Sequence, residues 1–321
     1  MNAPDPFACP RRETSSSPVS NEGMLRSTAN AVPIAAPRSR AADYTALAKP
    51  RLNVLVVASA LAGYAMAGGD GARTSVVLAV LAGTGLVAGG ASAFNQVLER
   101  RTDALMKRTR RRPLPDGRLG AIEGTVVAAA LSGAGLLILA LGANPLSAAV
   151  ALATLATYAV IYTPMKPLTS FATVIGAIPG ALPPVIGWAA ARDALSQGAW
   201  VLFGIVFLWQ LPHFLAIAWI YRDDHARAGF PMLPVIEPDG RSTGRQAAIY
   251  AAALLPLSLA PTLMGMAGRV YFAAALALTL AFVGLALRFA ATRSIGDARR
   301  LFFGSIVYLP VLWIVMIANR A

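Results

Sequence analysis

Three oxygen-bearing side chains recur at steps of four just after an apolar run that ends near Phe94. They are Asn95, Glu99 and Asp103. On an α-helix a step of four returns to the same face about one turn later, so the three side chains would form a row. Mg²⁺ takes oxygen ligands from one or two carboxylates and completes its shell with water and substrate phosphate. The row therefore predicts a Mg²⁺ site; the simpler interpretation is a helix end whose acids pair with nearby arginines.

A basic cluster follows this row within the same polar loop, in the stretch MKRTRRRPL at 106–114. Guanidinium groups bind phosphate oxygens through two parallel hydrogen bonds, whereas a basic cluster by itself would more often indicate contact with anionic lipid. An acidic metal row followed by forked donors can neutralise a diphosphate, which neither element could do alone. The loop therefore predicts a metal-dependent diphosphate site.

The elements that must position this loop are apolar helices. Of the 321 residues, 56% are apolar and 13% are charged, whereas soluble proteins carry about 25% charged residues. Apolar runs long enough to approach or cross a bilayer recur along the chain. We expect an all-α integral membrane protein of about nine transmembrane helices, rich in Gly and Ala and closely packed. The expected spans are about 52–68, 74–94, 124–141, 145–162, 171–191, 198–221, 247–267, 270–287 and 301–318.

Residues 1–42 are rich in Ala, Pro, Ser and Arg and show neither helical nor strand periodicity. They predict a disordered cytoplasmic leader before a transmembrane domain at 43–321. The leader lacks the uninterrupted apolar core of a secretory signal. It contains the single cysteine, Cys9, so no disulfide within the chain is expected, and Met24 is an alternative start.

The distribution of positive charge predicts the orientation. The chain has 28 Lys plus Arg against 15 Asp plus Glu, and basic residues are retained on the cytoplasmic side. With the amino terminus inside, most of them fall in inner loops, which leaves outside only Arg73, Arg192, Arg269 and Arg320. Nine spans then place the carboxyl terminus outside and both long polar loops, at about 99–120 and 222–246, on the inner face. No basic soluble domain is present, so nucleic-acid binding is not expected.

Polar and helix-breaking residues within the spans are a second source of signal. His213 follows Pro212 in the sixth span. A lone intramembrane His is most often a hydrogen-bonded packing residue, yet an ionisable group in a span is also a functional hypothesis. Pro179, Pro183 and Pro184 predict that the fifth span is a broken helix that widens a cavity, or simply a kinked one.

These residues carry a resemblance to a known family. The stretch NQVLERRTDALMKRTRRRPLPDGR at 95–118 resembles the first signature of the UbiA superfamily of intramembrane prenyltransferases. Its M-x-R-T-x-x-R-P-L extension points to the heme branch. The segments at 162–188 and 209–235 agree with that branch, as does Lys49-Pro50-Arg51 before the first span. The likeness extends from about Ala46 to the carboxyl end.

The resemblance implies a UbiA-type helical bundle with a central cavity. It implies transfer of a farnesyl group from farnesyl diphosphate to a vinyl group of heme B with addition of water, which gives heme O and diphosphate. The substrates would be farnesyl diphosphate and heme B, and the cofactor Mg²⁺. A bacterial inner membrane is the expected location, with a heme A synthase or oxidase-assembly protein as a partner.

The resemblance also assigns roles to individual residues. The expected metal ligands and catalytic residues are Asn95, Glu99, Asp103 and Asp224. The expected diphosphate-binding residues are Arg108, Arg112 and Lys166. Residues expected at a heme or second site are His213, Tyr221, Asp223 and His225. His213 would then be an iron ligand or a partner of a propionate.

The sequence departs from the family at several positions. Glu99 stands where many relatives have Asp, and Arg101 stands where many heme-type relatives have a further Asp. Quinone-type members carry a second D-x-x-x-D row, for which this chain has Tyr221 and His225 with Asp223 and Asp224 between them. The number of metal ions is therefore left open.

Two other functions compete with this interpretation. Within the same fold, the acceptor could be an aromatic or quinone precursor, or a chlorophyllide. Outside it, a multi-span transporter would also have Gly-broken helices and polar groups in its spans. A transporter would not need Mg²⁺ and would keep its function when Asp103 is changed to Asn, whereas the enzyme would stop forming product.

Overall fold

The computed structural model describes residues 39–68 and 73–321, so most of the predicted leader lies outside the described residues. Within them the regular secondary structure is helical, apart from one isolated bridge between Ala267 and Arg320. In this part of the chain nine segments are long and apolar enough to cross a membrane. The prediction of an all-α protein with about nine spans is confirmed.

The spans begin and end close to the predicted positions. They are α2 (Pro50–Gly68), α3 (Thr74–Leu98), α5 (Ala121–Gly142), α6 (Pro145–Ala156) with η1 (Thr157–Tyr162) and α7 (Thr163–Met165), α8 (Ala172–Ala181) with α9 (Pro183–Arg192), α10 (Gln197–Ile220), α13 (Arg241–Leu263), α14 (Arg269–Thr292) and α15 (Ile295–Ala318). The helices α13 and α15 begin before the expected spans at 247 and 301, because each opens with a polar turn that an apolar run does not include.

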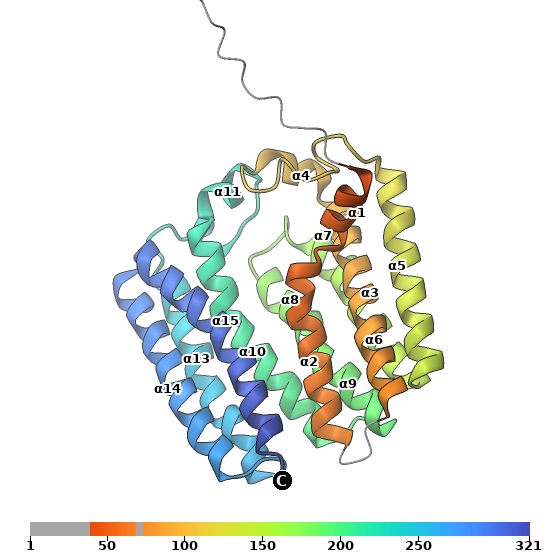
Figure 1. Ribbon diagram of the computed structural model, residues 1–321. Coiled ribbons are helices and arrows are strands. Elements are labelled where there is room, and N and C mark those ends of the chain that lie inside the picture. The colour runs from red at the N-terminus through yellow and green to blue at the C-terminus, as the bar shows by residue number, and fades with distance from the viewer. Residues whose placement is uncertain (1–38, 69–72) are drawn as a thin grey trace, which may run out of the picture. The chain divides into compact units, whose positions relative to one another are not determined.

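Four short helices complete the described chain: α1 (Arg40–Ala48), α4 (Arg100–Leu105), α11 (Arg222–Arg227) and α12 (Leu233–Ile236). In Figure 1, α1, α4 and α11 lie at one end of the bundle and the carboxyl terminus lies at the other. The two long polar loops therefore share one end, as their charge predicted. The helix α1 begins inside the predicted leader, because Ser39 caps it by accepting a hydrogen bond from the Ala42 N–H at 3.3 Å.

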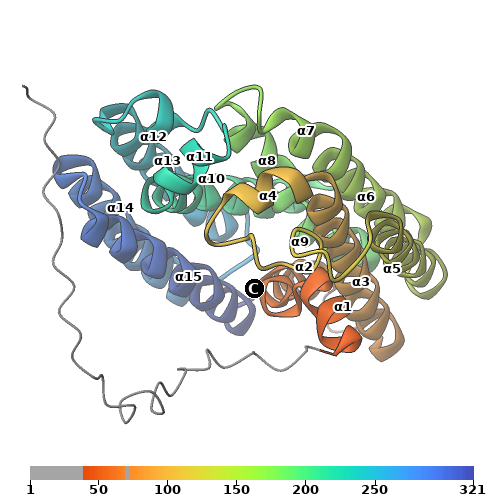
Figure 2. The same cartoon turned by 90° about the horizontal axis from the view of Figure 1, so that it is seen from above.

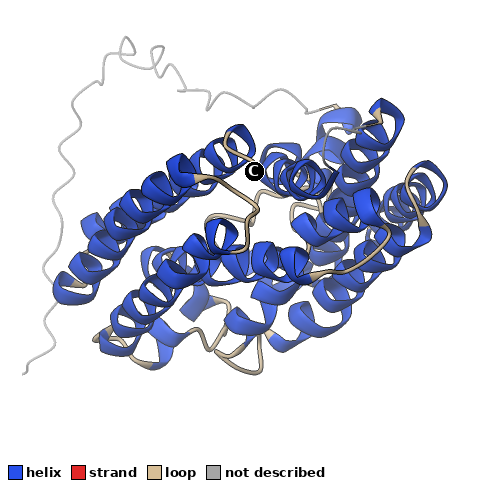
Figure 3. Ribbon diagram, turned by 90° about the horizontal axis from the view of Figure 1, so that it is seen from below, coloured by secondary structure: helices blue, strands red, loops and turns tan. Residues whose placement is uncertain are grey.

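The spans form two groups of packed helices. In one, α3 packs on α5 and α2 on α9; in the other, α10 packs on α13 and α15, and α14 lies against α13 and α15. Figures 2 and 3 show the two groups from opposite ends of the bundle. The helix α8 packs on α10 and so connects them. The site described below lies at the end of the bundle that carries α4 and α11.

The fifth span is a broken helix, as its prolines predicted. The helix α8 ends at Ala181 and α9 begins at Pro183. Proline suits the first turn of a helix, because the N–H that it lacks would have no partner within the helix there. The backbone of α9 approaches α2 so closely that a Cβ on Gly187 would lie 1.7 Å from the Ala60 carbonyl oxygen. A Cβ on Gly63 would lie 1.9 Å from the Pro184 carbonyl oxygen. Glycine at these two positions therefore sets the spacing between the two helices.

Candidate active site

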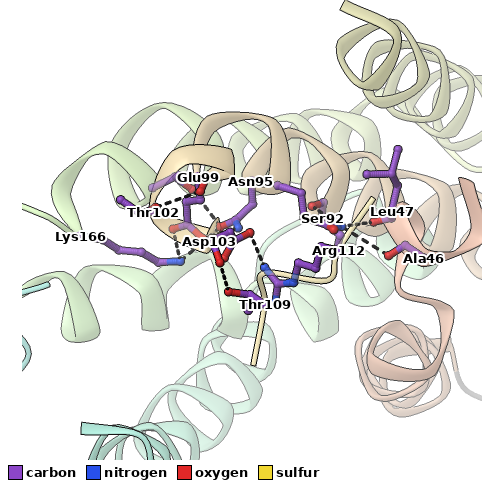
Figure 4. Close-up of polar contacts among 12 residues, drawn as sticks. Ala46, Leu47, Ser92, Asn95, Glu99, Thr102, Asp103, Thr109, Arg112 and Lys166 are labelled. Carbon is purple, nitrogen blue, oxygen red and sulfur yellow. Dashed lines mark hydrogen bonds and ion pairs between the residues drawn. The ribbon is translucent and has the colours of Figure 1, made fainter. Parts of the chain in front are cut away.

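The acidic row lies at the junction of α3 and α4. The expected helix is interrupted here, since α3 ends at Leu98 and α4 begins at Arg100. The helical hydrogen bonds nevertheless continue through the junction, from the Glu99 N–H to the Asn95 carbonyl at 2.9 Å and from the Asp103 N–H to the Glu99 carbonyl at 2.7 Å. Asn95, Glu99 and Asp103 therefore remain on one side of the backbone (Figure 4).

Lys166 reaches this row from the loop that follows α7. Its Nζ donates to Glu99 Oε1 at 2.6 Å and to Asn95 Oδ1 at 3.3 Å. Glu99 Oε2 accepts from Asn95 Nδ2 at 2.7 Å, so the three side chains form one buried network (Figure 4). The ammonium group also lies 4.5 Å from the centroid of the Tyr162 ring. The sequence predicted Lys166 at the site, and the structure brings it directly onto the acidic row.

Asp103 keeps one carboxylate oxygen without a partner. Its Oδ2 accepts from Arg112 Nη1 at 2.7 Å, and the residue is 0% exposed. Its Oδ1 is buried and has no hydrogen-bond partner. A buried charged oxygen without a partner costs free energy, which a bound cation would recover. Thr109 fixes the loop that carries Arg112, because its hydroxyl donates to the Asp103 carbonyl oxygen at 2.8 Å.

These groups line a cavity of about 320 Å³. One wall carries the row and four basic residues, namely Asn95, Glu99, Asp103, Lys49, Arg108, Arg112 and Lys166. Apolar side chains line the remainder, among them Leu52, Met106, Phe214, Ile217, Phe230 and Met232. The cavity therefore offers a strongly charged wall and an apolar wall to the same ligand.

Lys49 is a cavity residue that the sequence analysis did not select. It separates α1 from α2 and adopts the left-handed conformation with φ 48°. The residue before a proline disfavours the right-handed helical conformation, which is consistent with the end of α1 at Ala48. Gln96 holds the end of α1 against α3 by donating to the Leu47 carbonyl at 2.8 Å. Burial lowers the pKa of Lys49 to about 7, and the charge of Arg112 acts in the same direction. The signal that could have identified it is the Lys-Pro-Arg motif.

The acidic residues of the second polar loop have different surroundings. Asp224 accepts hydrogen bonds from the backbone N–H groups of Lys107 and Arg108, at 3.3 and 3.4 Å, and pairs with Arg227. It therefore holds the loop that carries Arg108. The carboxylate of Asp223 is 84% exposed and lies 3.8 Å from Arg222.

Tyr221 and His225 lie nearer the basic residues of the cavity. The guanidinium group of Arg108 lies 5.0 Å from the centroid of the Tyr221 ring. His225 lines the cavity, and its Nδ1 is buried without a hydrogen-bond partner. Burial, together with the neighbouring charge of Arg108, lowers the pKa of His225 to about 4, so the ring is neutral at neutral pH. His225 is thus a neutral polar group beside the cationic wall.

His213 lies away from the lining of this cavity, although Phe214 and Ile217 on the same helix contribute to it. Its Nδ1 lies 2.6 Å from Ser305 Oγ, which itself donates to the Phe302 carbonyl at 2.6 Å. Because the serine proton is used, the imidazole Nδ1–H is the donor and Nε2 keeps its lone pair. The ring stacks on Phe302, with centroids 5.0 Å apart. The helix α10 continues through Pro212 without a break.

The donor set fits Mg²⁺ better than a metal held by protein alone. Among the described residues, no three His, Cys, Asp or Glu side chains converge on one point. The row offers two carboxylates and one amide, and Asp103 Oδ1 has no partner. Mg²⁺ commonly keeps several waters and takes the rest of its shell from substrate phosphate. Glu99 and Asp103 with Asn95 are therefore suited to a metal that arrives with a diphosphate.

The fold and this site define a class of intramembrane transferase. Residues 56–307 match the UbiA prenyltransferase family, and the chain belongs to that family. Two relatives are both named protoheme IX farnesyltransferase. The protein from Solibacter usitatus is 47% identical over 87% of this chain and 98% of its own length. The protein from Koribacter versatilis is 44% identical over 90% of this chain and 97% of its own length.

Solved structures show the same fold. A digeranylgeranylglyceryl phosphate synthase matches with a TM-score of 0.73 at 15% identity, over 87% of this chain and 98% of that one. A UbiA homologue from Archaeoglobus fulgidus bound to GPP and Mg²⁺ matches with a TM-score of 0.65 at 16% identity, over 86% of this chain and 99% of that one. The predicted UbiA-type bundle is confirmed.

Proposed function

We propose that this protein transfers a farnesyl group from farnesyl diphosphate to a vinyl group of heme B. Water adds to the vinyl group in the same conversion, and the products are heme O and diphosphate. The observation that carries the proposal is the cavity with one charged and one apolar wall, in a chain that is 47% identical to a protein named protoheme IX farnesyltransferase.

The charged wall would act on the leaving group. As the allylic C–O bond breaks, negative charge develops on the diphosphate, and groups placed in advance to meet that charge lower the barrier. Arg108 and Arg112 would bind its oxygens through forked donors, and Lys166 would supply a point charge. Mg²⁺ on Asn95, Glu99 and Asp103 would neutralise the same oxygens as a Lewis acid. The A. fulgidus homologue was solved with both GPP and Mg²⁺, which supports this choice of metal.

The apolar wall would act on the transferred group. Loss of diphosphate leaves an allylic cation, which water would capture before the acceptor could react. Leu52, Phe214 and Ile217 line the cavity beside the charged wall and would exclude that water. The new C–C bond joins the farnesyl C1 to the terminal vinyl carbon. The other vinyl carbon then takes hydroxide from water, which releases a proton.

Asp224 and His213 have supporting roles in this proposal. Asp224 would position Arg108 through the loop backbone as well as supply a carboxylate near the diphosphate. His213 would contact heme through Nε2, because its Nδ1–H is already held by Ser305.

The surroundings of the enzyme form a further part of the proposal. The protein is a multi-pass membrane protein, and we place it in a bacterial inner membrane with the diphosphate site facing the cytoplasm. The loop at 99–120, which is rich in Arg and Lys, belongs to the end of the bundle that carries α4 and α11, opposite the carboxyl terminus (Figure 1). Its product would pass to a heme A synthase or an oxidase-assembly protein.

Reconstitution in lipid tests the proposal. The purified protein is incubated with heme B, farnesyl diphosphate and Mg²⁺, with and without a chelator. The masses of the extracted heme pigments are then measured by mass spectrometry. We expect a chelator-sensitive gain of one farnesyl group plus water. A product on an aromatic acceptor but not on heme would retain the diphosphate site and move the chain to the quinone branch. Substrate movement without any prenylated product would favour a transporter.

A further inference from the structure

A second, smaller cleft adjoins the diphosphate cavity and has no role in the chemistry described so far. It lies between the end of α10 and the first turns of α15, and its volume is about 210 Å³. Its lining is apolar and aromatic with one cation, and consists of Ile217, Ile220, Tyr221, Arg299, Phe302 and Phe303. Flat apolar ligands favour such walls, because aromatic rings can stack on them.

The cleft and the diphosphate cavity share a wall. Ile217 lines both spaces. Tyr221 lines the cleft, while its ring contacts Arg108, which lines the cavity. A ligand in the cleft would therefore lie next to the cavity in which the diphosphate is expected.

Arg299 is the charged group of the cleft, and it makes no ion pair with any described residue. Its neighbours on the same surface behave differently. Arg288 and Arg300 both pair with Asp297, at 2.8 and 2.7 Å. Asp297 thus holds two guanidinium groups, whereas the guanidinium group of Arg299 is left for an anion at the mouth of an apolar cleft.

His213 packs behind one wall of the cleft. Phe302 forms part of its wall and stacks on the imidazole ring at 5.0 Å. Ser305, which binds the imidazole, follows Arg299 by six residues, or about 9 Å along the axis of α15 at 1.5 Å per residue. A cation beside the aromatic walls of Tyr221, Phe302 and Phe303 matches a flat ring that carries carboxylates on one edge.

We propose that the cleft between α10 and α15 binds the carboxylate-bearing edge of the tetrapyrrole acceptor, with Arg299 pairing one propionate. This inference rests on the proposed function and adds the position and direction of the second substrate. The cleft is smaller than the roughly 300–1,000 Å³ of complete small-molecule sites, so it holds one edge of the ring. The opposite edge, which bears the vinyl groups, then extends over Ile217 into the cavity.

Heme binding in lipid nanodiscs tests the assignment of Arg299. Spectroscopic titrations with heme B compare the unaltered protein with Arg299→Gln and with Arg300→Gln, a matched loss of charge at the next position. We expect Arg299→Gln to weaken binding about tenfold, as the loss of one charge-assisted pair implies, and Arg300→Gln to leave it unchanged. Farnesyl diphosphate should bind all three proteins equally.

Heme B dimethyl ester supplies the complementary measurement, because its propionates carry no charge. It should bind the unaltered protein and Arg299→Gln with the same, weaker affinity. Equal binding of heme B by the Arg299 and Arg300 variants would overturn the assignment and leave the proposed function in place. If the unaltered protein bound farnesyl diphosphate but no heme, the acceptor in the proposed function would itself be wrong.

A steric variant tests the cleft independently of charge. Ile220→Trp would fill the space, and we expect it to abolish heme binding while farnesyl diphosphate still binds. Val307→Trp places the same ring on the 60% exposed outer side of α15 and serves as the control. Unchanged heme binding by Ile220→Trp would contradict the proposal.

Discussion

The substitution Asp103→Asn separates the charge of the acidic row from its shape. In the structure Oδ2 accepts from Arg112 at 2.7 Å and Oδ1 is buried without a partner. Asparagine would keep an acceptor for Arg112 and would place an amide group, without negative charge, where the metal ion is expected. The metal would lose one of two carboxylate ligands, while the packing would stay the same.

The expected effects differ in size for catalysis and for stability. Removal of one group that stabilises developing charge typically lowers kcat by about 10²–10³-fold, or about 3–4 kcal/mol. Breaking a fully buried ion pair costs about 3–5 kcal/mol, but here Arg112 is 22% exposed and keeps its hydrogen bond. We therefore expect a loss of about 1–2 kcal/mol in the free energy of unfolding, which leaves the protein folded.

The assay is heme O formation in lipid at a series of Mg²⁺ concentrations, with thermal unfolding measured in parallel. Asp116→Asn is the matched control, because this carboxylate lies in the same loop, pairs with Arg118 and is 43% exposed. We expect it to retain full activity. The assignment of the row would be refuted if Asp103→Asn kept more than about a tenth of the activity with the same Mg²⁺ dependence.

Two further predictions concern Lys49 and the contact between α2 and α9. Burial lowers the pKa of Lys49 to about 7, so its positive charge is lost as the pH rises through that value. Affinity for farnesyl diphosphate should fall over this range, and less steeply in Lys49→Arg, which stays charged. Gly187→Ala should lower the melting temperature markedly, since its Cβ would lie 1.7 Å from the Ala60 carbonyl oxygen. Gly133→Ala, with no neighbour within 4 Å, should not lower it.

The sequence predicted those parts of the site that depend on local geometry. Asn95, Glu99 and Asp103 could be grouped because a helical step of four holds even where the helix is interrupted at Glu99. The spans could be located because a bilayer requires long apolar runs. Their polar first turns were missed in α13 and α15, since those residues extend beyond the apolar run.

The remainder of the site depends on how distant segments pack. Nothing local to Lys49 indicates that Gln96, on another helix, holds the end of α1 against α3. The sequence suggested Asp224 as a second acidic position but did not indicate its partners. These depend on the path of the loop at 106–112, whose backbone N–H groups Asp224 binds. The interaction of Lys166 with Glu99 was accessible only through the family resemblance, because 67 residues separate them.

The acidic row already carries its own counterions, since Lys166 holds Glu99 and Arg112 holds Asp103. A divalent cation that arrives alone would meet the unpartnered Oδ1 of Asp103 but would have to displace Lys166 from Glu99. A phosphate that arrives alone would have to draw both basic groups away from the carboxylates. When both arrive, the four charges exchange partners and none is left without one. By linkage each ligand then strengthens the binding of the other by the same factor. If the row binds Mg²⁺ as proposed, the site would thus disfavour free metal and single phosphates until a prenyl diphosphate completes the exchange.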